Sequence, residues 1–123
     1  MAEHNFFGYS GEDLAVDYLR QHGYFVRDVN WRSGHKELDI VAEKEDCLVF
    51  VEVKTRRNAS YGRAEDAVNQ GKMSRIGLAA DAYVKCHRLD LPVRYDIITV
   101  VGKGEDARIE HIEDAFRSPV WYR

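Results

Sequence analysis

The segment that most constrains the fold is the run from Leu48 to Thr55, Leu-Val-Phe-Val-Glu-Val-Lys-Thr. Alternate side chains of a strand point to opposite faces of a sheet, and here both faces begin with large apolar residues. A strand that is apolar on both faces is covered on both, so we predict that it lies at the centre of a sheet. Its second half carries Glu52 and Lys54 on one face. Charges at the end of a buried strand cost desolvation free energy, which makes this end a candidate functional position.

The rest of the chain supplies elements that would flank this strand. Apolar residues at helical spacing, such as Leu14, Ala15, Tyr18 and Leu19, predict a helix that ends at Gly23. We predict further strands over Tyr24–Trp31, Glu37–Ala42, Val93–Val101 and Arg108–Ile112, a polar loop over Arg56–Gly62, and a helix over Ala64–His87 with a break near Gly71. The order αβββαβ, followed by a short last strand, predicts an α/β (α+β) fold in which helices pack on a sheet. A length of 123 residues indicates a single domain over 1–123.

Asp39 is expected to meet Glu52 across a hairpin. The charged segment Glu43–Asp46 separates two strands, and a turn centred near residues 45–46 places Asp39 opposite residues 51–52. Directly opposed Cβ atoms lie about 5 Å apart, and two unpaired carboxylates at that distance raise one pKa. A divalent cation removes this repulsion, and carboxylate oxygens suit Mg²⁺ or Mn²⁺. An ordinary salt bridge from Lys54 to Glu52 or Asp39 is the alternative, and the Glu-x-Lys pattern by itself favours that alternative.

Basic residues gather in one part of an acidic chain. The net charge is −3, but Lys54–Arg75 holds six basic residues and two acidic ones. A local positive patch on an acidic body can bind a phosphate backbone, although a solvated surface gives the same pattern. The candidate phosphate-binding residues are Arg32, Arg56, Arg57, Arg63, Lys72 and Arg75.

Several other classes of protein are disfavoured by the sequence. No apolar run approaches the roughly 18 residues that a membrane span needs, and no leader pattern is visible, so we expect a cytoplasmic protein without a membrane partner. Cys47 and Cys86 lack the CxxC spacing of a zinc site, and a disulfide is not expected in a reducing compartment.

Short motifs distributed over nearly the whole chain resemble one bacterial family. The motifs include Gly11-Glu12, Gly23-Tyr24, Asn30-Trp31-Arg32, Glu37-Leu38-Asp39-Ile40, Glu52-Val53-Lys54, Arg94-Tyr95-Asp96-Ile97-Ile98 and Ile109-Glu110-His111. Together they resemble the YraN-type family, which is related to Holliday-junction resolvases and other restriction-endonuclease-like nucleases. In this sequence Gly34-His35-Lys36-Glu37 replaces the more usual Gly-Gly-Glu, which puts additional bulk and charge beside the site.

The resemblance implies a restriction-endonuclease-like αβββαβ core with a mixed central sheet. It also implies that Glu12, Asp39, Glu52 and Lys54 occupy active-site positions, and that Mg²⁺, branched DNA and a homodimer are involved. Asp39 and Glu52 would hold the metal, together with the Val53 carbonyl. Lys54 would position the nucleophilic water, and Glu12 would assist as a ligand or base.

We therefore expect a metal-dependent nuclease acting on DNA in preference to RNA, on branched or damaged structures. A non-catalytic nucleic-acid-binding or adaptor protein in DNA repair or recombination is the main alternative. A structural domain with only a protein partner is the third.

Overall fold

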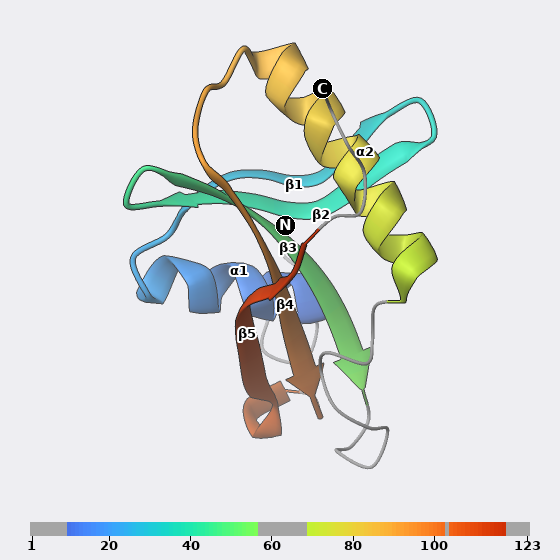
Figure 1. The fold of residues 1–123 in the computed structure, drawn as a ribbon. Coiled ribbons are helices and arrows are strands. Elements are labelled where there is room, and N and C mark those ends of the chain that lie inside the picture. The colour runs from blue at the N-terminus through green and yellow to red at the C-terminus, as the bar shows by residue number, and fades with distance from the viewer. Residues whose placement is uncertain (1–9, 57–68, 103, 118–123) are drawn as a thin grey trace.

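The structure is a computed structural model that describes residues 10–56, 69–102 and 104–117 (Figure 1). The elements are α1 (Gly11–Gln21), β1 (Phe25–Ser33), β2 (Lys36–Lys44), β3 (Cys47–Arg56), α2 (Gln70–His87), β4 (Val93–Val101), the short 3-10 helix η4 (Gly104–Asp106) and β5 (Arg108–Phe116). The predicted order αβββαβ with a further strand is confirmed. No helix in the described ranges is long and apolar enough to cross a membrane.

In these ranges five strands form one mixed sheet in the order β1-β2-β3-β4-β5. Strands β3 and β4 run parallel, and the other neighbouring pairs are antiparallel. The predicted central strand is confirmed, because β3 is the middle strand and is buried from Leu48 to Glu52. The molecule thus has the expected restriction-endonuclease-like α+β core, with a helix on either face of the sheet (Figure 1).

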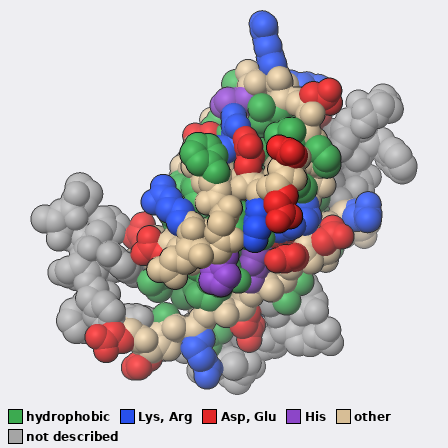
Figure 2. All heavy atoms as spheres, turned by 90° about the vertical axis from the view of Figure 1, so that its left-hand side faces the viewer, with side chains coloured by type: hydrophobic (Ala, Val, Ile, Leu, Met, Phe, Trp, Pro, Cys, Tyr) green, Lys and Arg blue, Asp and Glu red, His purple; other side chains and the backbone are tan. Residues whose placement is uncertain are grey.

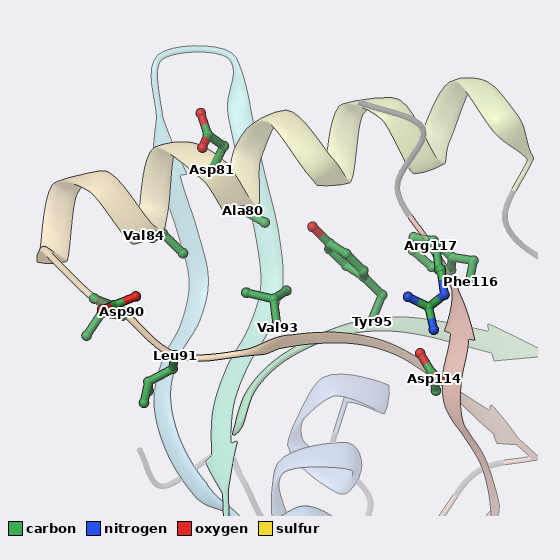
Figure 3. A pocket seen from close by; sticks show the side chains of 11 residues that line it. Ala80, Asp81, Val84, Asp90, Leu91, Val93, Tyr95, Asp114, Phe116 and Arg117 are labelled. Carbon is green, nitrogen blue, oxygen red and sulfur yellow. The ribbon is translucent and has the colours of Figure 1, made fainter. Parts of the chain in front are cut away.

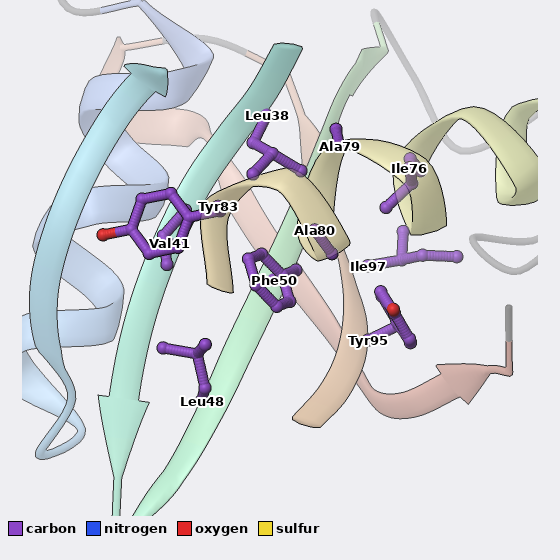
Figure 4. Packing of buried hydrophobic residues seen from close by; sticks show 10 residues of the cluster. All are labelled: Leu38, Val41, Leu48, Phe50, Ile76, Ala79, Ala80, Tyr83, Tyr95 and Ile97. Carbon is purple, nitrogen blue, oxygen red and sulfur yellow. The ribbon is translucent and has the colours of Figure 1, made fainter. Parts of the chain in front are cut away.

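Each helix covers its own apolar cluster. Ala15 and Leu19 of α1 are buried with Ile40, Val49 and Val51 of the sheet. On the other face, Tyr83 of α2 is buried among residues of β2, β3 and β4, and Figure 4 shows its ring beside Val41 and Phe50. The rings of Tyr83 and Phe50 meet edge to face with centroids 5.9 Å apart. Successive side chains of β3 thus enter different clusters, one on each face of the sheet. On the face of Phe50, the next side chains along the strand are Glu52 and Lys54.

Most predicted boundaries differ from the structure by one or two residues, and two elements, α2 and β5, differ by more. Helix α2 begins at Gln70, because the Asn69 side chain caps it by accepting a hydrogen bond of 2.9 Å from the Lys72 amide. The expected break near Gly71 therefore falls at Asn69, whose backbone is extended, and Gly71 itself lies in the first turn of α2. The predicted start at Ala64 falls outside the described residues. The last strand continues beyond Ile112 to Phe116. It passes Asp114 in a left-handed conformation, with φ of 53°, and the Asp114 amide donates to the buried Asp96 carboxylate.

Candidate functional site

Asp39 and Glu52 are joined across the end of the β2–β3 hairpin. The register pairs Val41 with Phe50 and Ile40 with Val51, and its next step sets Asp39 opposite Glu52. The ladder ends there, and the Val53 amide instead donates a hydrogen bond of 2.9 Å to Asp39 Oδ2. The predicted proximity of the two carboxylates is confirmed. Asp39 is fixed by the backbone of the strand that carries Glu52.

Glu52 is an acidic side chain held in a largely dehydrated position. It is 9% exposed, and burial raises its pKa, with the neighbouring charge of Asp39 raising it further. The ammonium of Lys72 opposes these effects, because its Nζ lies 2.7 Å from Glu52 Oε2. The expected repulsion between Asp39 and Glu52 is therefore present, and α2 supplies a cation that partly offsets it.

Lys54 acts on Glu52 at longer range. It lies on the same face of β3, and its charge lowers the pKa of Glu52 less than the hydrogen bond and charge of Lys72 do. Within the described residues, the ion-pair partner of Glu52 is Lys72. The salt bridge proposed from the sequence thus exists at Glu52, but the lysine comes from α2.

Glu12 is brought to the same end of the sheet by the start of α1. The Ser10 side chain caps this helix, and the Ser10 and Asp13 side chains accept each other's backbone amides at 3.1 Å. The chain passes so close to β3 that a Cβ on Gly11 would lie 1.9 Å from Thr55 Cγ2. Burial raises the pKa of Glu12, a hydrogen bond with Asn30 lowers it, and the charge of Asp39 raises it. Glu12 therefore interacts with Asp39, as expected for a third acidic residue of the site.

Asp39 and Glu52 line a pocket of about 570 Å³ between the start of β2 and the first turns of α2. Acidic and basic side chains share its wall, together with Ile76 and Leu78. The charged and imidazole-bearing residues are His35, Lys36, Glu37, Asp39, Glu52, Lys72 and Arg75. His35 and Lys36 thus lie beside the site, as the sequence predicted. Glu12 and Lys54 flank the carboxylate pair without lining this pocket.

The donor set suits a partly hydrated hard cation. In the parts of the chain that the structure describes, no three His, Cys, Asp or Glu side chains are grouped closely enough to form a ligand cage. Such a cage is typical of zinc, whereas Mg²⁺ binds through one or two carboxylates and keeps several waters. The oxygens of Asp39 and Glu52, open to a pocket wide enough for water, fit the second arrangement.

The predicted phosphate-binding residues separate into groups. Lys72 and Arg75 lie in the pocket, on one face of α2. Arg32 is exposed at the end of β1, where its guanidinium lies 3.5 Å from Glu37. Arg56 ends β3, and its carbonyl accepts a hydrogen bond of 2.9 Å from the Gly102 amide. Arg57 and Arg63 fall outside the described residues. The structure thus brings two of the six to the carboxylate pair.

Two other surfaces are less suited to a polyanion. A pocket of about 410 Å³ lies beside the last turns of α2, and Asp81, Asp90 and Asp114 surround its apolar floor (Figure 3). Among the described residues that line this pocket, one is basic, Arg117, and three are aspartates, so the charge of the described lining repels phosphate. On the face shown in Figure 2, acidic and basic side chains are interspersed, and neither sign forms a continuous patch. The pocket with Asp39 and Glu52 is the better candidate for nucleic acid.

Comparison with known proteins places the chain in a family. The sequence model of the uncharacterised protein family UPF0102 matches residues 11–100. The chain belongs to the UPF0102 family. A UPF0102 protein of Bacteroides thetaiotaomicron is 54% identical over 98% of this chain and 100% of its own length. UPF0102 proteins of Porphyromonas gingivalis and Flavobacterium psychrophilum are 48% and 45% identical, over 94% of this chain and 87% and 98% of their own lengths. The expected YraN-type relationship is confirmed, and the UPF0102 match spans Glu12, Asp39, Glu52 and Lys54.

A second charged cluster was missed by the sequence analysis. Asp96 in β4 is 0% exposed and also lies within the UPF0102 match. Its carboxylate accepts hydrogen bonds from Arg94, His111 Nε2 and the Asp114 amide at 2.7–3.0 Å. Burial raises its pKa, but the hydrogen bonds from His111 and Arg94 outweigh burial and lower it. The signal was present, since Arg94 and Asp96 are opposite charges two residues apart in an otherwise uncharged strand, but the sequence did not show that His111 and the Asp114 amide complete the cluster.

Proposed function

We propose that this protein is a metal-dependent nuclease that hydrolyses phosphodiester bonds in DNA, with branched or damaged DNA as the preferred substrate. One observation carries the proposal. The pairing of Asp39 with Glu52 sets two hard oxygen donors at the mouth of a pocket that also holds Lys72 and Arg75. The backbone of DNA is a polyanion, so its cleavage is favoured by a cation on the oxygens of the phosphodiester that is cut and by basic groups along the neighbouring phosphates.

The residues divide into three roles. Asp39 and Glu52 would hold Mg²⁺ or Mn²⁺, which supplies charge neutralisation at the phosphate and a lowered pKa of bound water. Lys54 would orient the attacking water and stabilise negative charge in the transition state. Glu12, whose pKa burial and Asp39 raise, is suited to accept a proton as a general base.

The residues that would contact the nucleic acid are those that line the pocket. Arg75 is exposed at the rim and would contact a phosphate, with Lys36 and His35 opposite it on β2 and its preceding turn. These contacts position a backbone without reading bases, which suits a nuclease that recognises DNA shape. We also propose a homodimer, because two copies related by a two-fold axis present two sites to a symmetric junction.

The test is cleavage of end-labelled four-way junction, flap and linear DNA, with single-stranded RNA as the comparison, in Mg²⁺ or Mn²⁺. Asp39→Asn and Glu52→Gln are expected to lower the rate by at least about a hundredfold. Asp17→Asn, on the exposed side of α1, is the matched control and should cleave like the wild type. Cleavage that persists in both site variants would show that these carboxylates are not the metal site.

The second candidate is a non-catalytic nucleic-acid-binding or adaptor protein in DNA repair or recombination. The Lys72–Glu52 ion pair favours it, because it partly neutralises the carboxylate cluster without a metal. This alternative predicts no metal-dependent cleavage by the wild type and unchanged DNA affinity in Asp39→Asn and Glu52→Gln. Fluorescence anisotropy with a labelled junction measures DNA affinity in these variants, and the cleavage assay with the wild type distinguishes the two candidates, because both predict binding that weakens with salt.

A further inference from the structure

The ammonium of Lys72 lies on the carboxylate that the proposed function assigns to a metal. Its Nζ is 2.7 Å from Glu52 Oε2, and the Glu52 side chain is only 10% exposed. Two cations cannot share that oxygen at bonding distance without strong repulsion in a poorly hydrated site. A divalent ion held by Glu52 through this oxygen would therefore compete with Lys72 for it.

The side chain of Lys72 can move away from Glu52 while its backbone stays in place. Its backbone is fixed in the first turn of α2, where its amide donates to the Asn69 side chain and the next amide, of Met73, donates to the Asn69 carbonyl, both at 2.9 Å. The side chain itself is 34% exposed and lines the open pocket. A lysine has a flexible stem and a compact charge, so it can move from one anion to another without moving the helix.

We propose that Lys72 is a placeholder cation. It neutralises Glu52 while the metal is absent, leaves when a divalent ion binds, and then presents its ammonium to a phosphate of the nucleic acid in the same pocket. This inference rests on the proposed function, because it takes Asp39 and Glu52 as the metal-binding pair. It adds to that function a link between metal binding and substrate binding.

The link follows from linkage thermodynamics. A metal that frees Lys72 makes one more basic group available to phosphate, so the metal should strengthen DNA binding. A phosphate that takes Lys72 from Glu52 should in turn strengthen metal binding by the same factor. Asp39 does not need to change partner in this exchange, because its Oδ2 is held by the Val53 amide. The exchange therefore involves one side chain on a fixed helix.

The experiment measures Mn²⁺ affinity without nucleic acid, by electron paramagnetic resonance of free Mn²⁺. Lys72→Met removes the competing charge and keeps the length of the stem, and it should bind Mn²⁺ about fivefold more tightly than the wild type, the factor that corresponds to one ion pair of ordinary strength. Lys72→Arg keeps a cation at the carboxylate and should stay within about twofold of the wild type. The control is Lys85→Met on the same helix, where Lys85 Nζ lies 2.9 Å from Asp81 Oδ2 and away from the pocket.

A second measurement follows DNA binding by anisotropy with and without Ca²⁺, another cation that prefers oxygen ligands. The metal should raise DNA affinity in the wild type and in Lys85→Met, and this increase should be smaller in Lys72→Met, which keeps only the metal's own contact with the phosphate. An equal increase in all three proteins would contradict the release of Lys72. Circular dichroism confirms that each variant is folded, and Lys72→Gln replaces Lys72→Met if the latter is not.

The outcomes separate this inference from the proposed function. Unchanged or weaker Mn²⁺ binding by Lys72→Met, with cleavage by the wild type intact, overturns the placeholder and leaves the nuclease. Equal tightening in Lys85→Met also overturns it, because the effect would then be one of overall charge. Tighter Mn²⁺ binding in Lys72→Met alone supports the placeholder even if no DNA is cleaved. Absence of Mn²⁺ binding in every variant overturns both.

Discussion

Replacing Asp96 by Asn should destabilise the fold by about 3–5 kcal/mol, the usual cost of breaking a buried ion pair by removing one partner. Each oxygen of this carboxylate accepts hydrogen bonds from two donors. Oδ1 accepts from Arg94 Nε at 2.9 Å and from the Asp114 amide at 3.0 Å. Oδ2 accepts from Arg94 Nη2 at 2.8 Å and from His111 Nε2 at 2.7 Å.

The magnitude follows from these contacts. Asn has the same shape but offers one oxygen, so an amide NH₂ would face two of the donors. Each hydrogen bond lost to a charged group costs about 1.5–3 kcal/mol, and two such losses give about 3–6 kcal/mol, in agreement with the ion-pair figure. The Arg94 side chain is 23% exposed and can recover little of this from water.

Urea unfolding followed by far-UV circular dichroism measures the effect. Thr99→Val is the matched control on the same strand. The Thr99 hydroxyl is buried and has no hydrogen-bond partner among the described residues, so its replacement by a methyl should leave stability unchanged or raise it. A loss below about 1 kcal/mol for Asp96→Asn, or a comparable loss for Thr99→Val, would refute the claim that the network stabilises the fold.

The pH dependence gives an independent check. The pKa of Asp96 is lowered in the fold: burial raises it, but the hydrogen bonds from His111 and Arg94 outweigh burial. A carboxyl with a lowered pKa contributes stability above its unfolded pKa, near 3.9, and that contribution is lost as pH falls through the lower folded value. The difference in unfolding free energy between the wild type and Asp96→Asn should therefore be full at neutral pH and shrink below about pH 4.

Three further outcomes are expected. Tyr83→Phe removes hydrogen bonds to Asp28 at 2.6 Å and from Arg27 at 3.0 Å, and should cost about 1–3 kcal/mol in urea unfolding. Burial, followed by the Asp28 hydrogen bond, raises the pKa of Tyr83 to about 12. The wild type should therefore lose stability as the pH rises from about 10, the unfolded pKa, to about 12, and Tyr83→Phe should lack this loss. Gly11→Ala should cost about 1–3 kcal/mol by overpacking against Thr55. Adding Thr55→Ser, which removes the opposing methyl, should restore stability. An equal loss from Gly11→Ala with Thr55 or with Ser at that position would contradict the close approach. Mn²⁺ at 100 times its dissociation constant should stabilise the wild type by about 2.7 kcal/mol in thermal unfolding, and chelation should reverse this, whereas Asp39→Asn should show no metal effect.

The hairpin that carries Asp39 and Glu52 could be predicted because every signal in it is local. The charged tip fixes the turn, the period of two fixes the faces, and the two together set the register. The same applies to β3 as the central strand, since its burial on both faces is visible in eight consecutive residues. Local patterns of this kind need no knowledge of distant elements.

The partner of Glu52 could not be predicted in that way. Six basic residues lie between Lys54 and Arg75, and which of them reaches Glu52 depends on where α2 begins. Gly71 suggested a helix break, whereas the Asn69 cap starts the helix just before it and turns Lys72 toward the sheet. Arg94 lies two residues before Asp96 on the same face of β4, so that contact is local, but His111 and the Asp114 amide come from β5, whose pairing with β4 includes an irregularity between Tyr95 and Ile97.

The two carboxylate clusters differ in how completely the fold satisfies them, and this difference separates a structural role from a functional one. Asp96 has donors on both oxygens from fixed groups, and its pKa is lowered, so the fold favours its charge. Glu52 has one movable lysine and a neighbouring Asp39, and burial followed by the charge of Asp39 raises its pKa, so the fold disfavours its charge. Glu52→Gln should accordingly leave stability at neutral pH unchanged or higher, since a raised carboxyl pKa means that ionisation opposes folding. A carboxylate whose ionisation the fold disfavours, open to a pocket with room for water, has the electrostatic environment in which functional carboxylates are often found.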